Sequence, residues 1–139
     1  MQPMRPTDGK PWGTADTPYE EIGGEAAVRQ LVETFYDRID GESPQLRAML
    51  PRDDSDSRQK LFEFLTGWLG GPRLYIERRG HPKMRLRHMP FAIGTTEADE
   101  WLRCMGAAMD DTDVTGPLRD YLDIRFRQMA IHMINQPPD

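Results

Sequence analysis

The residues with the clearest chemical potential in this chain surround His88. Residues 80–93 read GHPKMRLRHMPFAI, so that His88 follows a cation, Arg87, and precedes a helix-stopping proline, Pro90, and an aromatic residue, Phe91. A neutral imidazole is a good ligand for iron and other transition metals. An imidazole held at the end of a helix, beside a cation and an aromatic ring, suits a flat, apolar, anionic ligand.

Two other residues carry a hydrogen-bond donor into apolar surroundings. Tyr36 falls on the apolar side of its predicted helix, so its hydroxyl must find a buried partner. From the residues alone, one alternative stays open: Tyr36 is an ordinary core tyrosine whose hydroxyl bonds to a backbone carbonyl. Trp101 has an indole N–H that only donates, and burying this group without an acceptor is costly.

Length and charge exclude several classes of protein. A chain of 139 residues is long enough for one domain with a real core and too short for two. The net charge of −5 argues against a sequence-independent nucleic-acid binder. No apolar run approaches the ~20 residues of a membrane span, and the first residues lack the apolar core of a secretory signal. The one cysteine, Cys104, fits a reducing cytoplasm, which is the location we expect.

Helical periodicity begins near residue 17. Residues 1–16 are rich in proline and glycine and lack an apolar pattern, so we expect a mobile arm followed by one domain over residues 17–136. Thr17, with Pro18 next and Glu20 three residues later, has the pattern of a helix start. Two glycines at 23 and 24 should end that short helix.

The rest of the chain predicts an all-α fold. Apolar residues recur at helical spacing after residue 25, from the polar corner at 53–57 to Gly70, after Thr95 and after Gly116. A short turn is expected at 44–50, and Pro82 should begin a helix that ends before Pro90. Residues 73–80 suggest a connecting loop anchored by Tyr75 and Ile76. No stretch alternates for long enough to predict a strand.

With these motifs in place, the chain resembles the truncated haemoglobins of the second group, the two-over-two helical globins common in bacteria. The match runs from about Tyr19 to Asn135. It rests on Gly23-Gly24, Phe35-Tyr36, Trp68-Leu69-Gly70-Gly71-Pro72, Tyr75, Gly80-His81-Pro82, Arg87-His88-Met89-Pro90-Phe91 and Trp101-Leu102-Arg103-Cys104-Met105. The resemblance implies a two-over-two helical sandwich around haem b (iron protoporphyrin IX). Since the chain has no C-x-x-C-H motif, the haem would be held non-covalently.

The resemblance also implies roles for individual residues. His88 would be the proximal iron ligand, while Tyr36 and Trp101 would donate hydrogen bonds to a diatomic ligand on the other side. Ser57 would lie at the distal gate of the haem pocket. The alternative, of equal weight, is that Ser57 only begins a helix. Leu50 stands where the family usually carries an aromatic or polar residue, which reduces the distal donors to two.

The haem itself would contact apolar and cationic side chains. For each apolar candidate, ordinary core packing has the same weight as direct contact with haem. These candidates are Leu61, Phe64, Leu65, Met84, Phe91, Ile93 and Met105. The candidates to bind the two haem carboxylates are Arg87, Lys60, Tyr75 and His81. Arg87 is the strongest of them, because its forked guanidinium matches the two oxygens of a carboxylate. A solvated face is the alternative for Lys60. His132 falls on the apolar side of the last helix, where we expect a core histidine.

Three functions compete. The first is reversible binding of oxygen, nitric oxide or another diatomic ligand. The second is redox catalysis at the same haem, either nitric oxide dioxygenation or peroxide reduction. It needs a separate reductase because the chain has no nicotinamide motif. The third is a cofactor-free helical interaction module. We expect neither nucleic acid nor a membrane as a partner, and the oligomeric state stays open, a homodimer included.

Overall fold

The computed structural model describes residues 9–89 and 91–136, with the side chains of Met84 and Arg85 excepted. Over these residues the chain forms eight helices and no β-structure beyond one isolated bridge between Lys10 and Gly13. The all-α prediction is therefore confirmed. The helices are α1 (Pro18–Ile22), α2 (Glu25–Glu42), α3 (Pro44–Ala48), α4 (Ser55–Trp68), α5 (Leu74–Arg79), α6 (Met84–His88), α7 (Thr95–Asp111) and α8 (Gly116–His132).

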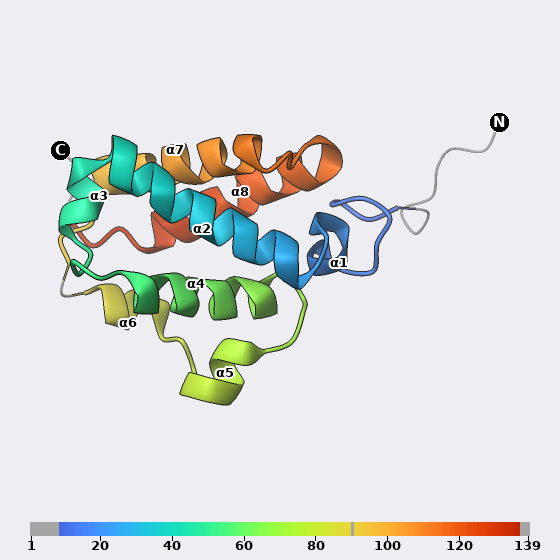
Figure 1. Ribbon diagram of the computed structural model, residues 1–139, viewed down its shortest axis with the longest axis horizontal. Helices are drawn as coiled ribbons and strands as arrows, with labels where there is room; N and C mark the ends of the chain where they lie inside the picture. The colour runs from blue at the N-terminus through green and yellow to red at the C-terminus, as the bar shows by residue number, and fades with distance from the viewer. Residues whose placement is uncertain (1–8, 90, 137–139) are drawn as a thin grey trace.

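The four long helices form two packed pairs. Helix α2 packs on α4, α7 packs on α8, and α2 also packs against α7, which joins the pairs. In Figure 1, α2 crosses in front of α8, α7 runs above them and α4 runs below. The short helix α5 packs on the outer side of α4. This arrangement is the predicted two-over-two sandwich.

An apolar stripe on α2 builds the centre of the core. Its six apolar residues, expected from their spacing of three and four, are all buried: Val28, Leu31, Val32, Phe35, Tyr36 and Ile39. Helix α7 adds Met105 and Met109, and α8 adds Leu122 and Phe126. Each fully buried side chain of this kind contributes roughly 1.5–3 kcal/mol relative to exposure. The packing therefore fixes α2, α7 and α8 against one another.

The first helix begins and ends as its sequence predicts. The Thr17 hydroxyl oxygen accepts the N–H of Glu20 at 3.1 Å, and Pro18 occupies the first turn. Gly23 ends the helix in the left-handed region with φ of 118°. Farther along the chain, a Cβ at Gly71 would lie within 2.9 Å of the Tyr19 ring, so glycine is needed where α1 packs on the end of α4.

The segment after α4 differs from the prediction. Residues 74–79 form helix α5 and are not a loop, and Ile76 is no anchor because its side chain is 49% exposed. Tyr75 is buried, as expected. Six residues are too few to show a helical period, and this helix is held by ion pairs to α4. Helix α6 begins at Met84, two residues later than expected, after Lys83 in the left-handed region with φ of 47°.

Residues 9–16 form a turn that contacts α1 and α8. The Trp12 indole N–H donates to the Ala15 carbonyl at 2.9 Å, and its ring meets that of Tyr121 edge-on at 5.3 Å. The Glu21 carboxylate accepts the backbone N–H groups of residues 14 and 15, each at 2.9 Å. The mobility of the arm and the domain boundary at residue 17 stay predictions. Within the described range, every helix is too short or too polar to cross a membrane.

Candidate functional site

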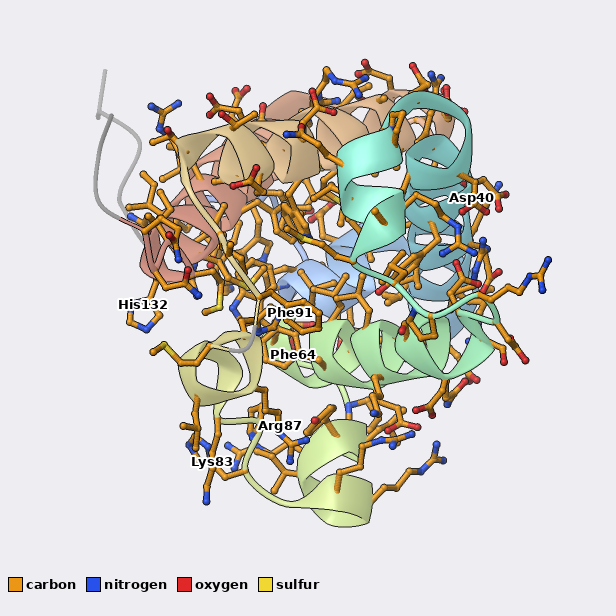
Figure 2. The ribbon with its side chains drawn as sticks, turned by 90° about the vertical axis from the view of Figure 1, so that its left-hand side faces the viewer. Asp40, Phe64, Lys83, Arg87, Phe91 and His132 are labelled. Atoms are coloured by element: carbon orange, nitrogen blue, oxygen red, sulfur yellow. The ribbon has the colours of Figure 1, made fainter. Side chains whose placement is uncertain are left out.

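A cavity of about 510 Å³ lies between the helix pairs and reaches α5 and α6. Ligand pockets in proteins commonly enclose roughly 300–1,000 Å³, so it has room for a large cofactor. Figure 2 shows two of its lining residues, Phe64 of α4 and Phe91 after α6, near the centre of the view, with Arg87 below them. Its walls are mostly apolar, and the polar groups that reach it are few.

His88 is the histidine that lines this cavity. It is the last residue of α6 and is half-buried. Its carbonyl oxygen accepts the N–H of Phe91 at 3.0 Å and the side-chain amide of Asn135 at 3.2 Å. The other two histidines, His81 and His132, line a second hollow of about 390 Å³ between α4, α6 and α8. His132 is exposed there (Figure 2), so the prediction of a core histidine was wrong.

Tyr36 brings a protonated hydroxyl to the cavity from α2. It is buried and donates a hydrogen bond to the Ser57 carbonyl oxygen at 3.3 Å. This bond is longer than the ~2.5–3.0 Å of a good O–H···O contact. Burial raises the pKa of the Tyr36 phenol well above its usual value, the Asp54 carboxylate adds to the rise, and Arg58 opposes it. The hydroxyl therefore keeps its proton near neutral pH and gives up little by turning to another acceptor.

An arginine at the start of α4 fixes the surroundings of Tyr36. The Arg58 guanidinium lies 5.4 Å from the centre of the Tyr36 ring and pairs with four carboxylates at 2.9–3.3 Å. Those carboxylates belong to Glu33, Asp37, Asp40 and Asp54. Three of them lie on α2, so Arg58 ties the first turn of α4, with its Ser57 carbonyl, to the helix that carries Tyr36.

Trp101 reaches the cavity from α7 with a rigidly held ring. Its ring centre lies 5.1 Å from that of Phe35 and 5.6 Å from that of Phe126, so α2 and α8 both contact it. Among the described residues, its indole N–H has no hydrogen-bond acceptor. Trp101 and Tyr36 line the same cavity, which thus has two donor groups from two helices.

Most of the other predicted site residues also line the cavity. They are Leu50, Ser57, Lys60, Leu61, Phe64, Tyr75, Arg87, Phe91 and Ile93. Lys60 pairs with Asp56 at 3.1 Å and is partly exposed. The Arg87 guanidinium lies 5.9 Å from the Tyr75 ring centre.

Three predicted residues lie elsewhere, and a fourth falls on a side chain outside the described residues. Leu65 and Met105 are fully buried in the helical core and do not line the cavity. His81 lies at the second hollow, where its Nδ1 accepts the Lys83 N–H at 3.0 Å. The side chain of Met84 is the one outside the described residues.

The prediction missed several lining residues. Met129 and Met133 come from the end of α8, four residues apart, and Met49 precedes Leu50. Ile39 lies one turn after Tyr36 on the same apolar stripe. That spacing was a signal for Ile39 and for the two α8 methionines, since residues three or four apart share a helix face.

A buried carboxylate fastens α5 beneath the cavity. Glu63 of α4 is 2% exposed and accepts hydrogen bonds from Arg79 at 2.8 Å, Gln59 at 2.8 Å and Arg78 at 3.2 Å. Burial by itself would raise the pKa of Glu63, but these donors outweigh it and lower the pKa to about 2. Because Tyr75 lies on α5, the same network sets the position of a cavity wall.

Replacing Glu63 with Gln should weaken the fold in a pH-dependent way. The folded-state pKa of about 2 lies below the usual 4.5, so the carboxylate contributes stability above pH 4.5 that is lost as the pH falls toward 2. A shift of this size corresponds to about 3 kcal/mol near neutral pH, of which about 2 kcal/mol should be gone by pH 3. Urea unfolding at pH 6 and pH 3 measures the difference between wild type and Glu63→Gln, which should shrink by that amount. Glu77→Gln, on the exposed side of α5, is the matched control and should show no such change.

The residues of the cavity fit haem in three respects. The cavity is large and mostly apolar, as a porphyrin requires. One histidine, His88, lines it and could supply a nitrogen ligand to the iron. Arg87, Lys60 and the Tyr75 hydroxyl lie along its wall and can meet two carboxylates.

Comparison with known proteins agrees with this geometry. The bacterial-like globin family matches residues 17–135. The chain is 46% identical over 121 residues to the group 2 truncated hemoglobin YjbI of Bacillus subtilis (strain 168), an alignment that covers 87% of this chain and 90% of the relative. The group II truncated hemoglobin from Bacillus anthracis superposes with a TM-score of 0.85 at 42% identity, covering 100% of this chain and 97% of that one. For the truncated oxygen-avid haemoglobin from Bacillus subtilis, the TM-score is 0.82 at 45% identity, with 86% and 100% covered. The chain therefore belongs to the bacterial-like globins and, among them, to the group 2 truncated haemoglobins, which makes it a haem-binding protein.

Proposed function

We propose that this protein binds one haem b non-covalently in the 510 Å³ cavity and uses it to bind oxygen reversibly, with slow release. The observation that carries the proposal is the shared cavity lining of one histidine, His88, and two hydrogen-bond donors, Tyr36 and Trp101. The haem supplies an iron centre that takes up diatomic ligands. The oxygen-avid relative from Bacillus subtilis, similar over 86% of this chain, supports this assignment.

His88 would hold the haem by its imidazole nitrogen. Two hydrogen bonds to its own carbonyl oxygen hold its backbone at the end of α6, where the residue lines the cavity. Arg87, the preceding residue, would pair with a haem carboxylate, because a guanidinium forms charge-assisted hydrogen bonds with such a group. The apolar walls exclude water and so strengthen both interactions.

Tyr36 and Trp101 would slow the release of oxygen. A diatomic ligand held in the cavity would gain electron density from the iron, and hydrogen-bond donors beside it would stabilise it. The Tyr36 hydroxyl would exchange its long bond to the Ser57 carbonyl for one to the ligand, and the Trp101 indole N–H would gain an acceptor that the described residues do not offer it. The small Ser57 and the aliphatic Leu50 line the same cavity and would leave room for a ligand beside Tyr36.

Stopped-flow oxygen dissociation from the ferrous protein tests the proposal, with carbon monoxide as the trapping ligand. We expect a single slow phase and full recovery of the ferrous protein when the cycle is repeated. The competing function is redox catalysis, either nitric oxide dioxygenation or peroxide reduction, with a separate reductase. Steady consumption of nitric oxide or peroxide in the presence of a chemical reductant would establish that alternative and replace ours.

Cys104 is fully buried and forms no disulfide, which agrees with the cytoplasm as the proposed location.

A further inference from the structure

The segment that carries His88 has little apolar packing of its own. Helix α6 is five residues long, too short to be stable without tertiary support. After it, the Met89 side chain is 55% exposed, so burial does not hold it tightly. Among the described residues between α6 and α7, Ile93 is the one that is buried. Other interactions must therefore fix the backbone next to the predicted iron ligand.

One side chain from the other end of the domain supplies those interactions. Asn135 lies three residues beyond α8, and its side-chain amide nitrogen donates to the carbonyl oxygens of Phe91 at 2.8 Å and His88 at 3.2 Å. Its amide oxygen accepts the Ile93 N–H at 2.9 Å, and its own backbone N–H donates to the Ile93 carbonyl at 2.8 Å. Both polar atoms of the side chain are thus used on the chain between residues 88 and 93.

These bonds reach the end of a short helix. The last carbonyls of any helix lack a partner inside the helix, so the His88 carbonyl takes its partners from outside α6, among them the Phe91 N–H and the Asn135 amide. Asn135 is 47 residues from His88 in sequence, so the contact closes the C-terminal end of the domain onto the ligand-bearing segment. Since the imidazole is attached to the backbone that Asn135 holds, the two positions are mechanically linked.

We propose that Asn135 is a positioning residue: its amide fixes the backbone of residues 88–93 and thereby sets how firmly His88 holds the haem. The inference rests on the function proposed above. Asn135 does not itself line the cavity. It acts through His88, Phe91 and Ile93, all of which line the cavity.

Two substitutions at Asn135 separate the halves of its contact. Asn135→Ala removes all three side-chain bonds to residues 88–93. Asn135→Asp keeps an oxygen for the Ile93 N–H and removes the donor to the carbonyls of His88 and Phe91. Gln128→Ala is the matched control, because Gln128 carries a similar amide on the exposed side of α8. All variants are prepared as full chains loaded with haem.

The first readout is the rate of haem transfer to excess apomyoglobin. Both Asn135 variants should lose haem about tenfold faster than wild type, the effect of one to two net hydrogen bonds. The second is the iron–histidine stretching band of the ferrous, ligand-free protein, which should shift in both variants and stay unchanged in Gln128→Ala. Thermal unfolding of the haem-free proteins checks that the variants are folded.

The two readouts together separate a positioning role of Asn135 from a purely structural one. If Asn135→Asp retains both the wild-type haem-loss rate and the wild-type band position, the donor to the His88 carbonyl does not position the ligand, and the inference is overturned. A lower unfolding temperature with an unshifted band would show a purely structural role and would overturn it as well. Failure of the wild-type chain to take up haem through His88 would instead overturn the proposed function.

Discussion

Replacing His88 with alanine should abolish stable haem binding. Of the three histidines in the chain, His88 is the one that lines the cavity, while His81 and His132 lie together at the second hollow. Without the imidazole, the apolar walls, Arg87 and Lys60 still attract a porphyrin, but no histidine remains in the cavity to bind its iron. The haem content of purified protein, measured from the ratio of haem to protein absorbance, should therefore fall close to zero.

The other two histidines provide matched controls for this result. His81→Ala and His132→Ala should keep the haem content and spectrum of wild type. Glycine at position 88 leaves room for free imidazole, and adding imidazole to His88→Gly should restore a histidine-like spectrum. A His88→Ala protein with normal haem content and a five-coordinate imidazole spectrum would show that another residue is the ligand.

Removal of either distal donor should speed the release of oxygen by about ten- to a hundredfold. A hydrogen bond to a charged group contributes roughly 1.5–3 kcal/mol, and ~1.4 kcal/mol corresponds to a factor of ten. Tyr36→Phe and Trp101→Phe each remove one such donor and leave most of the ring packing in place. Stopped-flow oxygen dissociation from the ferrous proteins measures the change.

Controls for the donor variants come from the same residue types far from the cavity. Tyr121→Phe and Trp12→Phe alter an aromatic pair between the N-terminal turn and α8 and should leave the rate unchanged. The double variant should release oxygen fastest, with an effect that departs from the product of the single effects because both donors act on one ligand. Unchanged rates in both single variants would remove the basis for slow release.

The raised pKa of Tyr36 has a consequence for pH dependence. Burial keeps the phenol protonated well past the pH at which an exposed tyrosine ionises, so its hydrogen bond is present throughout the physiological range. Oxygen release should therefore not accelerate between pH 6 and pH 9 through loss of this donor. A fall in the contribution of Tyr36, measured as the ratio of the Tyr36→Phe and wild-type rates over this range, would contradict that reading.

The parts of the fold that follow local rules were predictable from the sequence. Thr17 caps the beginning of α1 and Gly23 caps its end, as predicted. The spacing of apolar residues in α2 identified a buried face that includes Tyr36. The motif around His88 pointed to the residue that lines the cavity. In each case the signal lies within a few turns of one helix.

The parts that depend on contacts between distant segments were not predictable. Leu65 and Met105 have the same helical spacing as cavity residues, and only the neighbouring helices decide that they face the core. Helix α5 has too few residues to show a helical period of apolar residues. It is held by an ion pair to Glu63, and nothing in the sequence of α4 indicates that this carboxylate is buried. Asn135 has no local pattern at all, since its partners lie more than 40 residues earlier.

We infer that the cavity between the helix pairs is a haem site with His88 as its protein ligand. Titration of the haem-free protein with haemin, followed by reduction and an absorption and resonance Raman spectrum, tests it most directly. The expected result is saturation at one haem per chain and a ferrous, ligand-free spectrum of a five-coordinate iron bound by a neutral histidine. No saturable uptake, or a spectrum without an iron–histidine band, would contradict the account.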